Sequence, residues 1–414
     1  MSIWRNKKFS RYAFGMLFNS LGNSFFDLAV PLLIYNMTQS LALMGTMAIL
    51  VQLPKILLGP LIGALVDRLN PRRVLFCSYF LQIFIIAALP ITYYLNILTP
   101  WIVLTVGFLL NAVNLFARSA NFVITPLLYK DQSVQANVAF TTVWTFSMLI
   151  GPIIGAAILP FVYPMGLILI DGLTFFIMIF SLQLVGLPHR KITSKWKFTR
   201  IYKDMAEGFR MSFGNQSLRL FVLSIALCSF ATAPEITLVI YHLKSAFKFS
   251  DSYIGYFTSC AGFGLFAGTL FARYLKSKKS SNLFFIGYSM IAAGLLLLAI
   301  PSWYQIPVAL LIIEAGKIMY VIGRSAIIQT HCPKEYLGRV NSTFQLVEQI
   351  IYPIGMALAV LMIESFSMYT VFVGLGVVML LSLFVLFSSR ISLNEKTGNV
   401  FSAPTSSSIG SEKR

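Results

Sequence analysis

Residues 59–74 read GPLIGALVDRLNPRRV and decide the fold. This segment ends one long apolar run and begins the next, with an acid, three arginines and an Asn-Pro pair in between. Asn70 precedes a proline and therefore disfavours the helical region, so the helix is expected to end here. The small residues Gly59, Gly63 and Ala64 permit close approach of another helix. The segment predicts a short charged hairpin between two helices that lie in an apolar environment.

The composition excludes an ordinary soluble protein. The chain has 414 residues, of which 57% are hydrophobic and 11% charged, and its mean hydropathy is +0.79. Soluble chains carry about a quarter charged residues, and a run of about 20 apolar residues spans a bilayer as a helix. Twelve such runs are predicted, at 12–36, 41–66, 74–95, 101–127, 135–160, 164–187, 218–242, 252–275, 282–301, 305–329, 338–363 and 366–389. The expected fold class is an all-α membrane protein with twelve transmembrane helices.

The basic residues predict how the chain is oriented. Of the 32 Lys and Arg residues, 26 fall in the terminal segments and in the loops on their side, four lie inside the apolar runs, and Lys244 and Lys248 fall on the opposite side. Positive residues stay in the cytoplasm, so both termini are expected there. The net charge of +18 is thereby explained by topology and contact with membrane lipids, and nucleic acid is not expected as a partner.

The two halves of the sequence repeat one another. Gly63–Arg68 resembles Gly268–Arg273, Phe116–Ala120 resembles Ile322–Ala326, and 130–137 resembles 334–341, each about 205 residues later. Such repeats predict two pseudo-symmetric six-helix bundles. The predicted domains are an N-terminal bundle (1–188), a cytoplasmic linker with an amphipathic helix (189–217), a C-terminal bundle (218–390) and a disordered cytoplasmic tail (391–414).

The opening segment resembles a loop motif of the major facilitator superfamily, Gly-x-x-x-Asp-Arg-x-Gly-Arg-Arg. Gly63, Asp67, Arg68, Arg72 and Arg73 match that motif, whereas an asparagine stands in place of its second glycine. The resemblance implies that these five residues form a gate on the cytoplasmic side, that the two bundles rock about a central cavity, and that the protein works as a monomer.

Two carboxylates inside the apolar runs are the main candidates for proton or substrate handling. Asp27 and Glu235 lie at similar depths in the first and seventh runs, which correspond under the repeat. Ionisable groups in a membrane helix are costly and usually functional, and a carboxylate desolvated there can carry a proton. A permanent ion pair between Asp27 and Lys55 is the structural alternative.

Five further charged residues in the runs have weaker or divided interpretations. Glu314 lies three residues before Lys317, so the two share a helix face and are expected to neutralise each other, although Glu314 stays a coupling candidate. Arg118 resembles a helix-4 arginine that the superfamily associates with proton coupling; contact with lipid headgroups is the alternative. Asp171 and Glu348 are candidates for a functional role, but structural polar contacts between helices explain them equally well.

Two resemblances bear on the direction of transport. Gly151, Pro152 and Gly155 match the core of a motif found in antiporters of the superfamily, and such residues allow tight packing and a bent helix. The branch that holds macrolide and siderophore (enterobactin) exporters is resembled best by the first 80 or so residues, through Ser20–Asn23, Pro31–Tyr35, Leu53-Pro54 and the loop motif.

The sequence therefore predicts a proton-coupled antiporter of the bacterial inner membrane. Its cargo would be a small amphipathic molecule such as a drug, macrolide or siderophore. Export of a drug or a macrolide would confer antibiotic resistance. No reaction motif is present, so an enzyme, a cofactor and a metal are not expected. A lipid or lysophospholipid flippase of the same fold and a non-transporting membrane sensor or assembly protein stay open as alternatives.

Overall fold

The protein is almost entirely helical in a computed structural model that describes residues 3–66, 69–129, 132–185, 206, 209–214, 216–275, 280–332 and 336–388, and these residues contain no strand. Asp67, Arg68, most of the predicted linker and the predicted tail lie outside the described residues. Of the predicted amphipathic helix only the end is described, where Phe209 stacks on Phe213 with ring centroids 6.0 Å apart.

The N-terminal half forms one bundle. Its elements are η1 (Ile3–Arg5), α1 (Lys7–Thr38), α2 (Leu41–Val66), α3 (Pro71–Tyr94), α4 (Pro100–Leu128) and α5 (Ser133–Val185). Asn6 begins α1 by accepting hydrogen bonds from the backbone N–H groups of Lys8 and Phe9. Asn70 begins α3 in the same way, with Pro71 in the first helical position. The Asn-Pro pair thus ends one helix and starts the next, as the sequence predicts.

The 53 residues of α5 make two crossings of the membrane. A straight helix of that length would be about 80 Å long, well beyond a hydrocarbon core of about 30 Å. The chain turns at Tyr163, whose φ of 56° and ψ of 172° are not helical, between Pro160 and Pro164. Proline cannot donate the backbone bond that continues a helix. The turn falls where the sequence predicts a boundary between two helices.

The C-terminal half forms the second bundle. Its elements are α7 (Gln216–Thr232), α8 (Glu235–Ser245), α9 (Asp251–Tyr274), α10 (Ser280–Leu298), α11 (Ile306–His331), α12 (Leu337–Ser365) and α13 (Met368–Ser388). The sequence predicts one helix over 218–242, whereas the structure breaks it into α7 and α8 at Ala233 and Pro234. Counting α7 with α8 as one crossing and α5 as two, the described residues cross the membrane twelve times.

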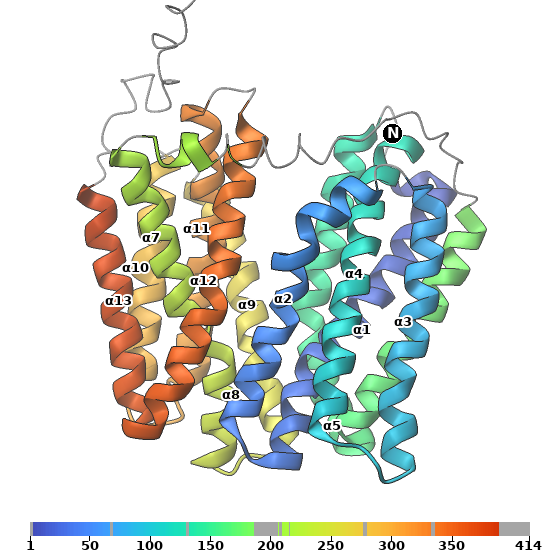
Figure 1. Ribbon diagram of the computed structural model, residues 1–414, viewed down its shortest axis with the longest axis horizontal. Helices are drawn as coiled ribbons and strands as arrows, with labels where there is room; N and C mark the ends of the chain where they lie inside the picture. Colours follow the sequence, from blue (N-terminus) through green and yellow to red (C-terminus); the bar gives the residue numbers. More distant parts are fainter. Residues whose placement is uncertain are drawn as a thin grey trace, which may run out of the picture.

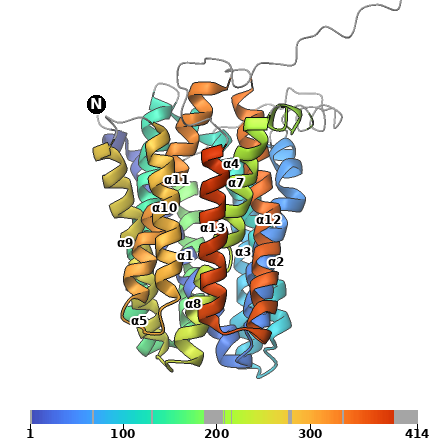
Figure 2. The same cartoon turned by 90° about the vertical axis from the view of Figure 1, so that its left-hand side faces the viewer.

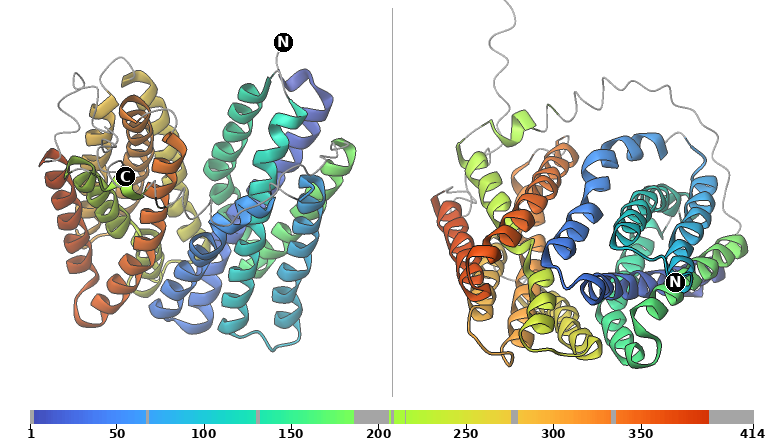
Figure 3. Two further views of the ribbon diagram at one scale, coloured as in Figure 1. Left: turned by 45° about the horizontal axis from the view of Figure 1, so that its top comes forward. Right: turned by 60° about the horizontal axis from the view of Figure 1, so that its bottom comes forward.

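The two bundles lie side by side, with α2 and α5 of the first facing α12 and α9 of the second (Figure 1). Glycines bring these helices together: a Cβ on Gly45 would lie 2.7 Å from Val360 Cγ2, and one on Gly262 would lie 2.8 Å from Leu149 Cα. The long helices run in roughly the same direction when the molecule is turned by 90° (Figure 2). The bundles approach each other at the end away from the N-terminus and diverge toward the end that carries it (Figure 3).

Candidate functional site

Three charged side chains of the C-terminal bundle form one cluster at mid-depth. Lys317 on α11 places its Nζ 2.7 Å from Glu235 Oε2 and 2.6 Å from Glu314 Oε1. The Glu235 side chain is 1% exposed, whereas that of Lys317 is 28% exposed. The expected Glu314–Lys317 contact is present, but Glu235 of another helix shares the same cation. Two carboxylates therefore compete for one ammonium group, and one of them can be discharged by a proton without leaving Lys317 unpaired.

The break between α7 and α8 positions Glu235. Pro234 has no N–H to donate, and Glu235 is the first residue of α8. A helix N-terminus carries partial positive charge and stabilises a carboxylate placed there. Broken membrane helices at the interface of two repeats are a common way to build a transport site.

The N-terminal bundle holds a second cluster, contributed by α1, α2 and α4. Asp27 is exposed although the residues on either side of it, Phe26 and Leu28, are buried. Lys55 and Arg118 are the cations that attract its carboxylate. No ion pair joins any two of the three, all of which lie in the described part of the chain. The alternative that Asp27 and Lys55 form a permanent ion pair is wrong for this conformation, because Lys55 Nζ instead donates to Gln52 Oε1 at 2.7 Å.

This N-terminal cluster faces the other bundle. Gln52, which accepts from Lys55, is also in polar contact with Tyr352 of α12. Tyr352 in turn interacts electrostatically with Glu235 and Lys317. The Lys55–Gln52 contact therefore lies on the side of the N-terminal bundle that faces the cluster around Lys317. Charged groups facing lipid at this depth would cost several kcal/mol, so exposure toward the partner bundle is the favourable arrangement.

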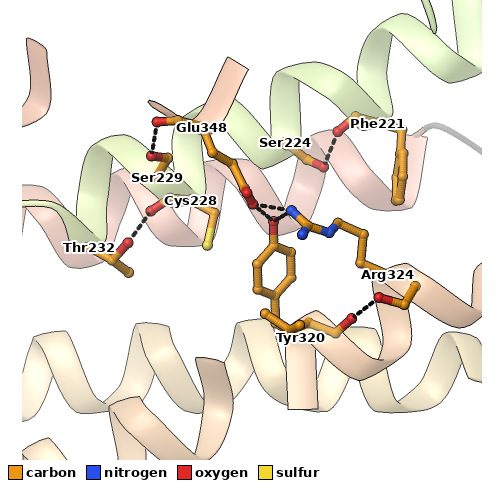
Figure 4. Close-up of polar contacts among 10 residues, drawn as sticks. Phe221, Ser224, Cys228, Ser229, Thr232, Tyr320, Arg324 and Glu348 are labelled. Carbon is orange, nitrogen blue, oxygen red and sulfur yellow. Dashed lines mark hydrogen bonds and ion pairs between the residues drawn. The ribbon is translucent and has the colours of Figure 1, made fainter. Parts of the chain in front are cut away.

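Arg324, which corresponds to Arg118 under the repeat, is held by an ion pair and by hydrogen bonds through its Nη1 atom (Figure 4). Its Nη1 donates to Glu348 Oε1 and, at 3.0 Å, to the Tyr320 hydroxyl. Tyr320 also donates to Glu348 Oε1. Ser229 Oγ of α7 donates to the backbone carbonyl of Glu348 at 2.8 Å, which ties a third helix to the network. Glu348 thus makes the polar contact between helices that the sequence allows, whereas the guanidinium of Arg118 has no such partner among the described residues.

The Gly151–Gly155 segment of α5 is a packing surface for α1. A Cβ on Gly151 would lie 2.4 Å from Ser24 Cβ, and one on Gly155 would lie 3.1 Å from Leu28 Cδ2. Ser24 Oγ donates to the Ser147 carbonyl at 3.3 Å, which is possible because the helices lie so close. Pro152 lies between these contacts within the helix. The helix that carries Asp27 is held through these small residues.

The predicted cytoplasmic gate is only partly described. Gly63 lies near the end of α2, and Arg72 and Arg73 lie in the first turn of α3. Arg72 also lies over the ring of Phe76, with 5.8 Å from Cζ to the ring centroid. Since Asp67 and Arg68 are outside the described residues, the gate remains a prediction.

A third polar group, at the end of the bundles away from the N-terminus, was not predicted. Asn36 of α1 donates from Nδ2 to Asp251 Oδ2 of α9 at 2.9 Å, and Lys244 of α8 pairs with the same carboxylate. The signal in the sequence was the isolation of Lys244 among very few basic residues on that side of the membrane. In the described residues no group of three or more His, Cys, Asp and Glu side chains could hold a metal ion.

The fold and these clusters define a class: a multi-pass membrane transporter built from two repeated bundles, each of which holds charged side chains. A model of the Major Facilitator Superfamily matches residues 12–350 and 225–408. The chain belongs to that superfamily.

Relatives agree with this assignment. Macrolide efflux protein A of Streptococcus pyogenes is 24% identical over 368 residues, which cover 86% of this chain and 89% of the relative. Macrolide efflux protein A of Enterococcus faecalis is 25% identical over 325 residues, covering 76% and 99%. A crystal structure of a bacterial homologue of the iron transporter ferroportin, in an inward-facing state, shares the fold with a TM-score of 0.73 at 18% identity, covering 94% and 99% of the two chains.

Proposed function

We propose that this protein is a proton-coupled antiporter that exports a small amphipathic molecule from a bacterial cell. The cargo class includes drugs such as macrolides, and siderophores. The proposed location is the inner membrane with both termini in the cytoplasm, based on the distribution of basic residues. The proposed working unit is a monomer, because one chain supplies both bundles and both charged clusters.

One observation carries the proposal: repeat-related helices hold two carboxylates in different surroundings. Asp27 is exposed beside Lys55 and Arg118, neither of which forms an ion pair within the described residues, while Glu235 is buried against Lys317. A proton on either carboxylate changes the net charge of its cluster, and hence the attraction across the interface between the bundles. Protons can therefore bias which end of the molecule is open, which is what coupling to a proton gradient requires.

Two observations favour export over import. Macrolide efflux proteins are among the relatives, each matched over most of its length. The Gly-Pro-x-x-Gly segment, which resembles an antiporter motif, packs directly on the helix that carries Asp27. The proposed cycle binds cargo from the cytoplasm with the bundles apart at the N-terminal end. It then releases the cargo outside after they close there.

The test of the proposal is an efflux assay in cells that lack other exporters of the compound. Expression of the chain should lower accumulation of a macrolide, and a proton uncoupler should abolish the effect. Asp27→Asn removes the titratable group at constant size and is expected to reduce efflux at least about tenfold. Glu364→Gln is the matched control, because Glu364 is exposed and lies near the far end of α12.

Three outcomes would contradict the proposal. Efflux that persists in the presence of uncoupler would exclude proton coupling, and normal efflux by the Asp27→Asn variant would remove that residue from the mechanism. A change in lipid asymmetry without any change in drug accumulation would identify a flippase instead.

A further inference from the structure

Five residues at the end away from the N-terminus bring the two bundles together. Tyr35 and Asn36 belong to the last turn of α1, Tyr241 and Lys244 to α8, and Asp251 to the first turn of α9. We refer to these five residues as the end cluster. The first two lie on the N-terminal bundle and the other three on the C-terminal bundle.

The contacts within the end cluster cross between the bundles in three places. Asn36 Nδ2 donates to Asp251 Oδ2 at 2.9 Å. The rings of Tyr35 and Tyr241 meet edge to face with centroids 5.8 Å apart. The Lys244 ammonium group lies over the Tyr35 ring, 5.9 Å from its centroid. An aromatic pair and a cation–π contact therefore reinforce one hydrogen bond to a charged acceptor.

The charges of the end cluster are distributed unequally. Lys244 and Asp251 pair with each other inside the C-terminal bundle, and their side chains are only 12% and 19% exposed. The N-terminal bundle contributes a neutral amide and a tyrosine ring. If the bundles separated here, the ion pair would stay together and no charge would lose its partner, so the large cost of stranding a buried charge is avoided.

The location of the end cluster gives it a consequence for transport. The close glycine contacts between the bundles, Gly45 with Val360 and Gly255 with Ala156, also fall in the half away from the N-terminus. An opening toward that side requires all these contacts to break. The glycine contacts are apolar van der Waals contacts without directional bonds. The end cluster instead supplies directional polar contacts at the end of the bundles farthest from the N-terminus.

We infer that the end cluster is a releasable latch that holds the far side of the transporter shut, with Asn36 as its crossing partner and the Lys244–Asp251 pair as its fixed receptor. The neutral amide makes the latch reversible, because it binds a charged acceptor when closed and is solvated by water when open. The inference depends on two bundles that move relative to each other and not on the identity of the cargo or of the coupling ion.

The experiment measures the conformational equilibrium of the purified full chain in lipid nanodiscs. Spin labels at Ala42 on α2 and Ala246 after α8 report the separation of the bundles at this end, since both positions are exposed and lie outside the latch. Asn36→Leu removes the donor at similar size. It is expected to raise the ratio of separated to closed molecules about tenfold, because a hydrogen bond to a charged group is lost only in the closed state.

A matched control and a double variant separate the latch from general damage. Thr46→Val removes a hydrogen bond that Thr46 makes to its own helix, at Ala42 O, and should leave the ratio unchanged. Asp251→Ala should shift the ratio in the same direction as Asn36→Leu. Adding Asn36→Leu to the Asp251→Ala variant should then have no further effect, since the bond is already absent.

Thermal unfolding of each variant shows whether it folds. If the Asp251→Ala variant does not fold, the comparison of Asn36→Leu with Thr46→Val decides alone, because Asn36 is exposed and substitutions at exposed positions usually change stability little. An unchanged ratio in Asn36→Leu, or an effect of that substitution that persists at full size without Asp251, overturns the inference. Neither outcome bears on proton coupling, which the efflux assay tests separately.

Discussion

At the scale of single residues, the repeat supplies two arginines with different surroundings. Arg118 and Arg324 occupy equivalent places on α4 and α11, yet Arg324 binds Glu348 and Tyr320 while Arg118 is exposed near Asp27. The sequence could align the two residues, but it could not distinguish their roles, because Glu348 comes from another helix. Arg324 joins helices of its own bundle, and we propose that Arg118 responds to the charge at Asp27.

Substituting the two arginines should therefore give opposite patterns. Arg324→Met leaves Glu348 without its cation and should lower the free energy of unfolding by about 3 kcal/mol. Arg118→Met removes no ion pair and should leave the unfolding temperature nearly unchanged while reducing proton-coupled efflux. Thermal unfolding in detergent and efflux in cells measure the two effects. Equal loss of stability in both variants would contradict this division.

Lys317 provides a second prediction at this scale. Lys317→Gln leaves Glu235 and Glu314 facing each other, and the Glu235 carboxylate is almost completely buried. The free energy of unfolding should fall by about 3 kcal/mol. Efflux should fall as well. Adding Glu314→Gln removes one of the two like charges and should restore part of the stability. If the double variant is no more stable than Lys317→Gln alone, repulsion between the two carboxylates is not the cause.

At the scale of the elements, the apolar runs predict every helix crossing, but they miss the interruption that positions the site. Runs of about 20 apolar residues and the Gly, Pro and Asn residues between them determine where each helix begins and ends. Hydropathy does not detect the break at Pro234, because long apolar stretches lie both before it and after Glu235. Pro234 lies directly before Glu235 in the sequence. A proline next to a carboxylate inside an apolar run was the signal that could have identified the break.

The contact of α5 with α1 gives a prediction about packing. Gly151→Ala would place a Cβ 2.4 Å from Ser24 Cβ, so α5 must shift and stability should fall by about 1–3 kcal/mol. Gly374→Ala on α13 is the matched control, since no atom of another helix in the described residues lies within 4 Å of its Cβ position. Alanine there should be neutral or slightly stabilising. Thermal unfolding compares the two, and similar losses would show that the close packing at Gly151 is unimportant.

At the scale of the whole molecule, the internal repeats and the local hydrophobicity were enough to predict the architecture. The contacts between the two halves could not be predicted from the sequence. Repeats about 205 residues apart predict paired bundles, and each bundle follows from local hydrophobicity. The end cluster joins residues more than 200 positions apart, such as Asn36 and Asp251. No local pattern specifies such a pairing. The same holds for Glu235 with Lys317, which lie on helices that are distant in the sequence.

The close approach of α2 and α12 allows a test of movement between the bundles. A Cβ on Gly45 would lie 2.7 Å from Val360 Cγ2, so the Cβ atoms of two cysteines at these positions are within reach of a disulfide. In a background without the four native cysteines, Gly45→Cys combined with Val360→Cys should transport when reduced. Oxidation should stop transport and reducing agent should restore it, because the far end can no longer open. The single variants, treated alike, should be unaffected by oxidation. Transport at the normal rate by the fully cross-linked protein would mean that cargo does not leave between the bundles at this end, and the rocking of two rigid halves would have to be abandoned as the mechanism.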